Sequence, residues 1–160
     1  MKIRTATNAD IERISQVHIA SIRSLCNTHY SREQLDSWTS ALTPSAYDHA
    51  LREKVFLVAE DPDKGLLGLG MLDIENAQIS AIYIHPDASG RGTGALLLSE
   101  LESIAHESNI DELTVHSTLN AQGFYTRLGY VKKFMTTHTL PDGSKLECIQ
   151  MTKDMSPATE

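Results

Sequence analysis

Three alternating glycines near the middle of the chain are the residues whose spacing most directly suggests chemistry. Gly90, Gly92 and Gly94 follow an apolar run and precede a helical pattern, with Arg91 between the first two. Glycine has no Cβ, so its backbone amides can approach a bulky anion closely. The unpaired N–H groups and positive dipole at a helix N-terminus favour the same kind of ligand. The stretch predicts a phosphate-binding loop, with Arg91 beside the bound charge.

The two generic phosphate motifs do not fit these glycines. The Lys-Ser/Thr pair that ends a P-loop does not follow Gly94, and the last glycine of a dinucleotide fingerprint is also missing. A solvated loop before a helix would show the same glycines. The interpretation therefore depends on the elements that surround the loop.

The loop is predicted to join a buried strand to a helix. Residues 79–84 are apolar at nearly every position, which indicates a central strand covered on both faces. Pro86 lacks a backbone donor, so the strand should end before it. After the loop, apolar residues recur at helical spacing, and this pattern predicts a helix that ends near His106.

The other elements follow from periodicity and turn residues. Thr7 and Asp10 resemble a capping box, and the apolar spacing beyond them predicts a helix with His18 packed and hydrogen-bonded on its inner face. Two more helices are expected to begin at Ser31 and Thr43, and a short one should cover 121–128. The remaining strands are expected at residues 2–6, 55–60, 66–74, 113–117, 131–139 and 145–152.

Length and composition favour one globular domain. The chain has 160 residues, of which 41% are hydrophobic and 22% charged, and a chain of this size buries roughly two thirds of its surface. The domain is expected to cover residues 1–155, with a frayed tail at 156–160. The formal charge of −7 and the pI near 5.4 disfavour a nucleic-acid partner.

Cysteine usage and hydropathy bear on metal content and location. Cys26 and Cys148 have no metal-binding or redox spacing, so no metal and no oxidising compartment are expected. No apolar run reaches membrane length, and the first residues do not resemble a signal peptide. A cytoplasmic protein without a membrane partner is the expectation.

Two motifs together resemble the GCN5-related N-acetyltransferase (GNAT) superfamily, over essentially the whole chain. The family signature is Gln or Arg, two residues, Gly, one residue, then Gly or Ala. Here it corresponds to Ser89-Gly90-Arg91-Gly92-Thr93-Gly94, after Tyr83-Ile84-His85-Pro86. A second family element, Asn-Ala followed by Phe-Tyr and a closing Leu-Gly-aromatic, corresponds to residues 120–130.

The resemblance implies a fold and a co-substrate. The fold class would be mixed α/β, with a central, mostly antiparallel twisted sheet of about six to seven strands, a splayed parallel pair and about four flanking helices. Acetyl-CoA would be the donor, with its arm along the exposed strand backbone and its pyrophosphate on the loop amides. The implied cofactor-binding residues are Ile82, Tyr83, Ile84, Ser89, Gly90, Arg91, Gly92, Thr93, Gly94, Ala95, Asn120 and Tyr125.

The family pattern also assigns catalytic roles. Tyr125 would be the general acid beside the departing sulfur, because a phenol with a pKa of roughly 10 is close to a thiol in acidity. Packing against the cofactor alone is the other interpretation of Tyr125. The backbone N–H of Ile82 could polarise the thioester carbonyl.

The general base is a separate question. Some relatives carry a glutamate four residues before the position of Ile82, and this chain has Gln78 there. A neutral amide cannot accept a proton. Glu75 or Asp73 could act through water, and His116 on the next strand has a suitable side chain. Glu75 is the preferred candidate among these residues.

Two departures from the family pattern concern the cofactor. Ser89 replaces the usual Gln or Arg at the head of the loop, so weaker binding is expected. Thr118 stands where many relatives carry Asn, while Asn120, two residues later, is placed to reach the cofactor arm.

The sequence therefore predicts an acetyl-CoA-dependent N-acetyltransferase that acts by direct attack in a ternary complex. The acceptor would be a primary amine of a small molecule, peptide or protein. A homodimer is possible, because homodimers are common among similar proteins. Tyr30 and Trp38 could line the acceptor pocket, although packing the helices together is the simpler role. The alternative function is a non-catalytic acyl-CoA-binding sensor or scaffold, which the neutral Gln78 keeps open.

Overall fold

A seven-stranded sheet with the order β1-β2-β3-β4-β5-β7-β6 organises the computed structural model, which describes residues 1–156. The strands are β1 (Lys2–Thr5), β2 (Val55–Asp61), β3 (Gly65–Asp73), β4 (Gln78–Ile84), β5 (Glu112–Thr118), β6 (Val131–Thr139) and β7 (Lys145–Asp154). The helices are α1 (Ile11–Leu25), α2 (Arg32–Ser40), α3 (Pro44–Glu53), α4 (Thr93–Glu107) and α5 (Gln122–Arg127). Short 3₁₀ helices are η1 (Asn8–Asp10), η2 (Pro86–Ala88) and η3 (Leu119–Ala121).

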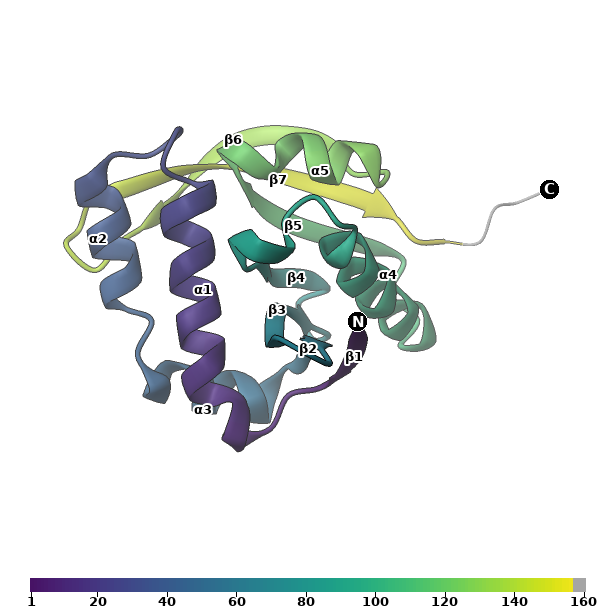
Figure 1. Cartoon of the computed structure of the whole chain (residues 1–160). Coiled ribbons are helices and arrows are strands. Elements are labelled where there is room, and N and C mark those ends of the chain that lie inside the picture. The colour runs from purple at the N-terminus through teal and green to yellow at the C-terminus, as the bar shows by residue number, and fades with distance from the viewer. Residues whose placement is uncertain (157–160) are drawn as a thin grey trace.

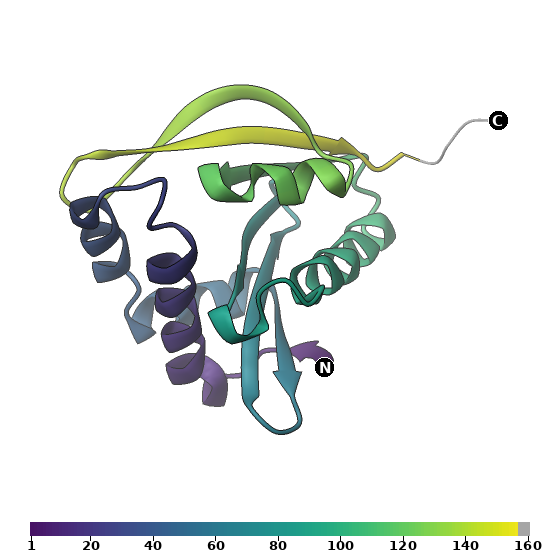
Figure 2. The same ribbon diagram turned by 45° about the horizontal axis from the view of Figure 1, so that its top comes forward.

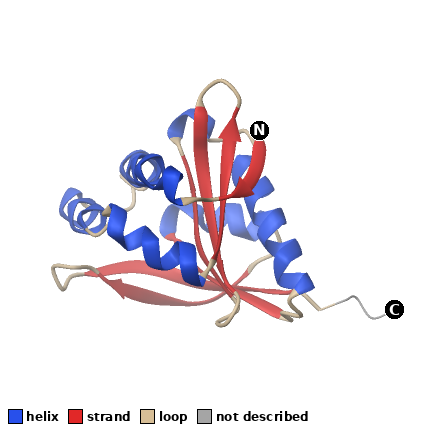
Figure 3. Ribbon diagram, turned by 90° about the horizontal axis from the view of Figure 1, so that it is seen from below, coloured by secondary structure: helices blue, strands red, loops and turns tan. Residues whose placement is uncertain are grey.

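Helices cover both faces of this sheet (Figure 1). Helix α4 lies on one face of β2–β4 and α1 on the other, while the β6–β7 hairpin arches across one end of the molecule (Figure 2). The α4 face is packed by Leu97 and Leu101, and the α1 face by Ile14 and Val17. The view coloured by secondary structure shows the same layering from below (Figure 3).

Strands β4 and β5 form the one parallel pair of the described sheet, and they pair only briefly. Their register joins Gln78 with Thr114 and Ile79 with Val115, and ends there. All other neighbouring strands are antiparallel. The predicted fold class, a mostly antiparallel sheet with a splayed parallel pair, is confirmed.

A β-bulge lies on β4 at the point where the two strands separate. Met71 of β3 pairs with Ala81 of β4, but the next residue of β3, Leu72, pairs with Ile79, so Ser80 is the extra residue. A bulge bends its strand and increases the local twist. The bulge at Ser80 therefore directs the rest of β4 away from β5.

Local signals in the sequence account for most helix boundaries. Ser31 caps α2 by accepting a hydrogen bond from the Gln34 amide at 3.1 Å, and the Gln34 side chain accepts one from the Ser31 amide at 2.8 Å. The Thr7 amide likewise donates to Asp10 at 2.8 Å, as the predicted capping box requires. The described residues form five α-helices where the family resemblance implies about four, and the shortest of them, α5, contains 6 residues.

Two further sequence predictions concern membrane-spanning segments and the C-terminal tail. In the described part, no helix has both the length and the apolar character that crossing a membrane requires. Of the predicted tail at 156–160, residues 157–160 lie outside the described residues.

Candidate active site

The separation of β4 from β5 opens into a cavity of about 590 Å³. Its wall combines the C-terminal half of α1, the end of β4, the glycine loop with the start of α4, and the segment from Thr118 to α5. The lining residues are Ser21, Leu25, Cys26, Ile82, Tyr83, Ile84, Ala88, Ser89, Gly90, Gly92, Thr93, Gly94, Ala95, Thr118, Asn120, Ala121, Phe124, Arg127 and Leu128.

The backbone of β4 presents unpaired groups to this cavity. The His85 amide donates to the Leu67 carbonyl of β3 at 2.7 Å, so His85 points its backbone groups towards β3. Because backbone direction alternates along a strand, Ile84 and Ile82 point theirs the opposite way, towards β5. The pairing with β5 has already ended at Ile79. The N–H and C=O groups of Ile82 and Ile84 are therefore available to a ligand.

The N-terminus of α4 presents a second set of unpaired donors. Gly92 is its N-cap in the left-handed conformation, with φ +83°, and no side chain caps the helix. The first intrahelical bond runs from the Leu96 amide to the Gly92 carbonyl at 3.0 Å. The amides of the first turn, residues 93–95, therefore have no intrahelical acceptor, and these residues line the cavity. Their arrangement suits an anion.

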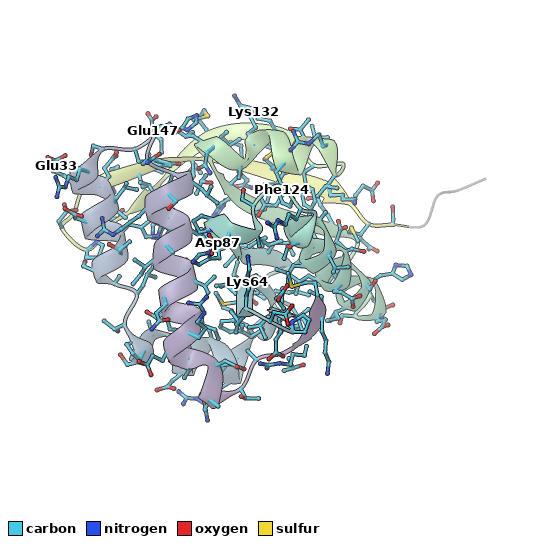
Figure 4. All side chains as sticks on the ribbon, in the orientation of Figure 1. Glu33, Lys64, Asp87, Phe124, Lys132 and Glu147 are labelled. Carbon is cyan, nitrogen blue, oxygen red and sulfur yellow. The ribbon has the colours of Figure 1, made fainter. Side chains whose placement is uncertain are left out.

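Close packing between α4 and α5 favours glycine at position 94. A Cβ at this position would lie 3.3 Å from the ring of Phe124, which approaches the start of α4 (Figure 4). Gly90, with φ +77°, instead has open space around it, so conformation rather than packing favours glycine there. Both glycines line the cavity.

Asn120 carries an unsatisfied polar atom on the opposite side of the cavity. Its Oδ1 atom is buried without a hydrogen-bond partner among the described residues. The side chain lies beside Cys26, whose pKa is raised by burial to about 11. A buried amide oxygen next to a ligand cavity fits an N–H donor of an extended ligand, such as the amides of a pantetheine arm.

The structure places Tyr125 in the core behind the cavity rather than on its wall. The side chain is 5% exposed and its ring packs edge-on against Phe124 and Tyr130, with centroids 5.0 and 5.5 Å away. Burial raises the pKa of Tyr125 above its ordinary value. Burial also raises the pKa of Tyr83, and the nearby Tyr125 adds to that effect. Its neighbour Phe124 lines the cavity, so the Tyr125 ring packs directly behind a residue of the wall.

Aromatic side chains gather beside the cavity on the α1 face. The Tyr83 ring lies with its centroid 4.2 Å from that of His18 and 6.2 Å from that of Trp38. The Trp38 ring meets Tyr30 edge-on at 6.0 Å. Neither Tyr30 nor Trp38 lines the cavity itself, so their predicted role in substrate binding stays a prediction.

Tyr30 has a structural role that its hydrogen bonds define. Its hydroxyl donates to the Glu147 carbonyl of β7 at 2.7 Å and accepts from the Leu119 amide of η3 at 2.8 Å. Leu119 immediately precedes Asn120. Tyr30 therefore fixes the segment that carries the Asn120 side chain.

His18 is packed and hydrogen-bonded on α1, as the sequence indicates. Its Nδ1 lies 2.9 Å from the Tyr47 hydroxyl, and burial lowers the pKa of His18 to about 3. The Nε2 atom is buried without a hydrogen-bond partner in the described part of the chain. His18 is therefore neutral at physiological pH.

The candidate bases lie near the beginning of β4. Glu75 is exposed in the turn between β3 and β4, at the end of β4 remote from Ile82. Asp73 accepts a hydrogen bond from the Asn76 side chain at 2.8 Å, and this bond lowers the pKa of Asp73. His116 bridges Gln78 and Gln150 on the neighbouring strands. None of the three acidic or basic candidates lines the cavity.

Several wall residues were not predicted. Arg127 and Phe124 come from α5, one helical turn apart, while Arg91 of the loop is exposed and lies off the wall. Ser21 comes from α1 and Cys26 directly follows this helix, in a stretch where the sequence shows only a core-facing stripe. The Phe-Tyr motif contained a signal for Phe124, but the sequence does not place α1 against β4. Within residues 1–156, no group of three or more metal-binding side chains is found.

Comparison with known proteins supports one family. The model of the family described as "Acetyltransferase (GNAT) domain" matches residues 26–154. An uncharacterized N-acetyltransferase of Pyropia yezoensis is 25% identical over 133 residues, which are 81% of this chain and 70% of that protein.

Solved structures agree with the family match. A GCN5-related N-acetyltransferase from Rhodopseudomonas palustris has a TM-score of 0.90 at 30% identity, covering 96% of this chain and 94% of that one. The PaiA N-acetyltransferase from Thermoplasma acidophilum, crystallised with coenzyme A, shares the fold with a TM-score of 0.76 at 22% identity, covering 96% and 98%. The chain therefore belongs to the GNAT family and is an N-acetyltransferase.

Proposed function

We propose that this N-acetyltransferase transfers an acetyl group from acetyl-CoA to a primary amine by direct attack in a ternary complex. The observation that carries the proposal is one shared cavity. The free backbone of Ile82 and Ile84 and the free amides at residues 93–95 all face it. These are the two features that an extended carrier with an anionic end requires.

The cavity suits each part of the donor. The uncapped start of α4 and the left-handed Gly90 and Gly92 favour the pyrophosphate, because backbone donors and the helix dipole point at it. The buried Asn120 oxygen matches an amide N–H of the pantetheine arm. Among proteins of the same fold, the Salmonella typhimurium protein yncA was crystallised with acetyl-CoA, with a TM-score of 0.65 at 19% identity.

The chemistry follows from the charges that acyl transfer creates. The thioester supplies an electrophilic carbonyl, and the Ile82 N–H would stabilise negative charge on its oxygen. The amine nitrogen forms the C–N bond, the C–S bond breaks, and its electron pair stays on sulfur. Tyr125, kept protonated by its raised pKa, would supply a proton or hydrogen bond to that sulfur.

A thiol-release assay tests turnover. Purified protein is incubated with acetyl-CoA and a panel of primary amines, peptides and proteins, and free coenzyme A is measured. Tyr125→Phe should lower kcat by about 100-fold or more while the Kd for coenzyme A stays within about twofold. Turnover with at least one amine is expected of the unchanged protein.

The matched control is Tyr130→Phe, the same substitution in a neighbouring buried tyrosine. Tyr130 donates to Glu102 at 3.1 Å, so the variant should lose stability but keep its kcat. Equal loss in both variants would remove Tyr125 from the chemistry. Tight coenzyme A binding without turnover on any amine would instead support the alternative function, a non-catalytic acyl-CoA sensor. The burial of Tyr125 behind the cavity wall is the observation that favours this alternative.

A further inference from the structure

A polar chain of three side chains crosses β4, β5 and β7 near the point where β4 and β5 separate. The Gln78 amide nitrogen of β4 lies 3.4 Å from His116 Nδ1 of β5. His116 Nε2 lies 3.3 Å from Gln150 Oε1 of β7. The proposed function leaves all three side chains without a role.

The two glutamines determine how the imidazole of His116 is protonated. The amide nitrogen of Gln78 can only donate, so Nδ1 accepts; the amide oxygen of Gln150 can only accept, so Nε2 carries the hydrogen. The bond to Nδ1 is long, and a water molecule competes well for that lone pair. His116 is thereby held with its basic nitrogen directed towards β4.

His116 lies at the point where β4 and β5 separate. The last residue of β5 that pairs with β4 is Val115, so His116 is the first residue beyond that pairing. Leu113 and Val115 pack in the α4-side core, and alternation directs His116 to the opposite, α1 face. Thr118, on the same face and about 7 Å further along the strand, lines the cavity.

The surroundings of His116 leave it open to water and to an acceptor. His116 is exposed, and the two side chains bonded to it are neutral amides. A charged group from outside the sheet reaches β4: Lys54, at the C-terminal end of α3, has its Nζ 3.2 Å from the Ser80 hydroxyl. On β6, the residue paired with Gln150 is Phe134, which carries no charge. No carboxylate therefore bonds His116 or competes with it for a proton.

We propose that His116 is the general base of the transfer, oriented by Gln78 and Gln150. This inference rests on the proposed function. The acceptor ammonium loses one proton through a water molecule to Nδ1 of His116. The freed nitrogen pair then attacks the acetyl carbon. As the C–S bond breaks, the nitrogen releases its second proton to solvent and the departing sulfur is protonated from Tyr125. Solvent afterwards restores the protonation of both residues. Gln78 is a positioning residue in the place where some relatives carry a carboxylate.

The pH dependence follows from the chemistry of an imidazole. A histidine ordinarily titrates near pH 6.5, and only the neutral form accepts a proton. The rate should therefore fall as the pH is lowered and the imidazole of the base becomes protonated.

The experiment compares His116→Gln with the matched control His106→Gln, which changes an exposed histidine at the C-terminal end of α4. Steady-state kinetics are measured from pH 5 to 9 with an amine that the unchanged protein acetylates. We expect His116→Gln to lower kcat by about 100-fold or more and to remove the acidic limb of the kcat profile. His106→Gln should retain both the rate and the limb.

Coenzyme A titration separates this inference from the proposed function. Both histidine variants should bind coenzyme A with unchanged Kd, because neither residue lines the cavity. A His116→Gln variant that keeps its rate and its acidic limb would overturn the inference. Loss of the rate in Glu75→Gln instead would assign the base to Glu75 and would also overturn it.

A second measurement does not require the acceptor. Long-range ¹⁵N NMR of the full chain should show His116 as the Nε2–H tautomer, and Gln150→Leu should shift the population towards Nδ1–H. The Nδ1–H tautomer in the unchanged protein would contradict the inference, because Nδ1 would then have no lone pair for a proton.

Discussion

The two walls of the cavity are built in different ways. The wall at residues 90–95 is one continuous stretch in which backbone amides and left-handed glycines provide the contacts. The facing wall uses side chains such as Cys26 and Asn120, which come from distant parts of the chain. Tyr30 joins these parts through its bond to Leu119, 89 residues away in sequence.

The two walls should therefore differ in the substitutions that they tolerate. A backbone-built wall is insensitive to most side-chain changes but fails when a glycine is replaced. In a wall built from side chains, substitutions can alter which ligand is preferred while the path of the backbone stays the same. We therefore expect the donor site to depend on a few glycines, and the acceptor side to depend on many side chains of modest individual effect.

Gly92→Glu should give the largest effect, because it places strain and a negative charge where the pyrophosphate binds. The Kd for coenzyme A should rise by about 100-fold or more in calorimetric titrations. Gly143→Glu is the matched control, since Gly143 has a similar φ of +86° in the β6–β7 turn. Equal weakening in both variants would show that the loss comes from strain rather than from the site.

Tyr30→Phe should have the next largest effect, on stability. It leaves the Leu119 amide and the Glu147 carbonyl without their shared partner, which should cost about 2 kcal/mol and lower Tm by about 6 °C. Tyr130→Phe, which breaks the single bond to Glu102, should cost about half as much. Thermal unfolding measures both variants, and an unchanged Tm for Tyr30→Phe would contradict the role of Tyr30 as a link between the walls.

Asn120→Leu should weaken binding of the donor arm selectively. The variant removes the unpaired Oδ1 acceptor, so the Kd for coenzyme A should rise by about 10-fold. ADP, which has the pyrophosphate but no arm, should bind both proteins equally. If ADP binding weakens as much as coenzyme A binding, Asn120 acts on the phosphate wall and the contrast between the walls is lost.

His18 should make the fold sensitive to mild acid. Its pKa is lowered by burial from the ordinary 6.5 to about 3, so below pH 6.5 the unfolded chain binds a proton that the folded chain does not. The free energy of unfolding should therefore fall between pH 6.5 and 5, with a slope of at most about 1.4 kcal/mol per pH unit from this group.

Denaturant unfolding of His18→Gln tests this slope. The variant should show a flatter profile in that range, whereas His106→Gln should follow the unchanged protein. Parallel profiles for all three proteins would exclude His18 as the source of the acid sensitivity.

Local chemistry determined much of the fold in advance. The capping residues Thr7 and Ser31, the glycines of the loop and the apolar run before Pro86 act within a few residues of themselves. Their structural consequences follow from sterics and hydrogen bonding alone. For this reason the helix and strand positions, the loop before α4 and the splayed pair of strands were predicted from the sequence, the last through a family resemblance.

Tertiary structure alone decided which side chains meet. The bulge at Ser80, the approach of α1 to the end of β4, and the contacts of His116 with Gln78 and Gln150 join segments that no local pattern relates. The burial of Tyr125 behind the wall and the exposure of Glu75 in a turn are likewise results of packing. Backbone geometry is encoded residue by residue, whereas these contacts depend on how the whole sheet twists and on which helices cover it.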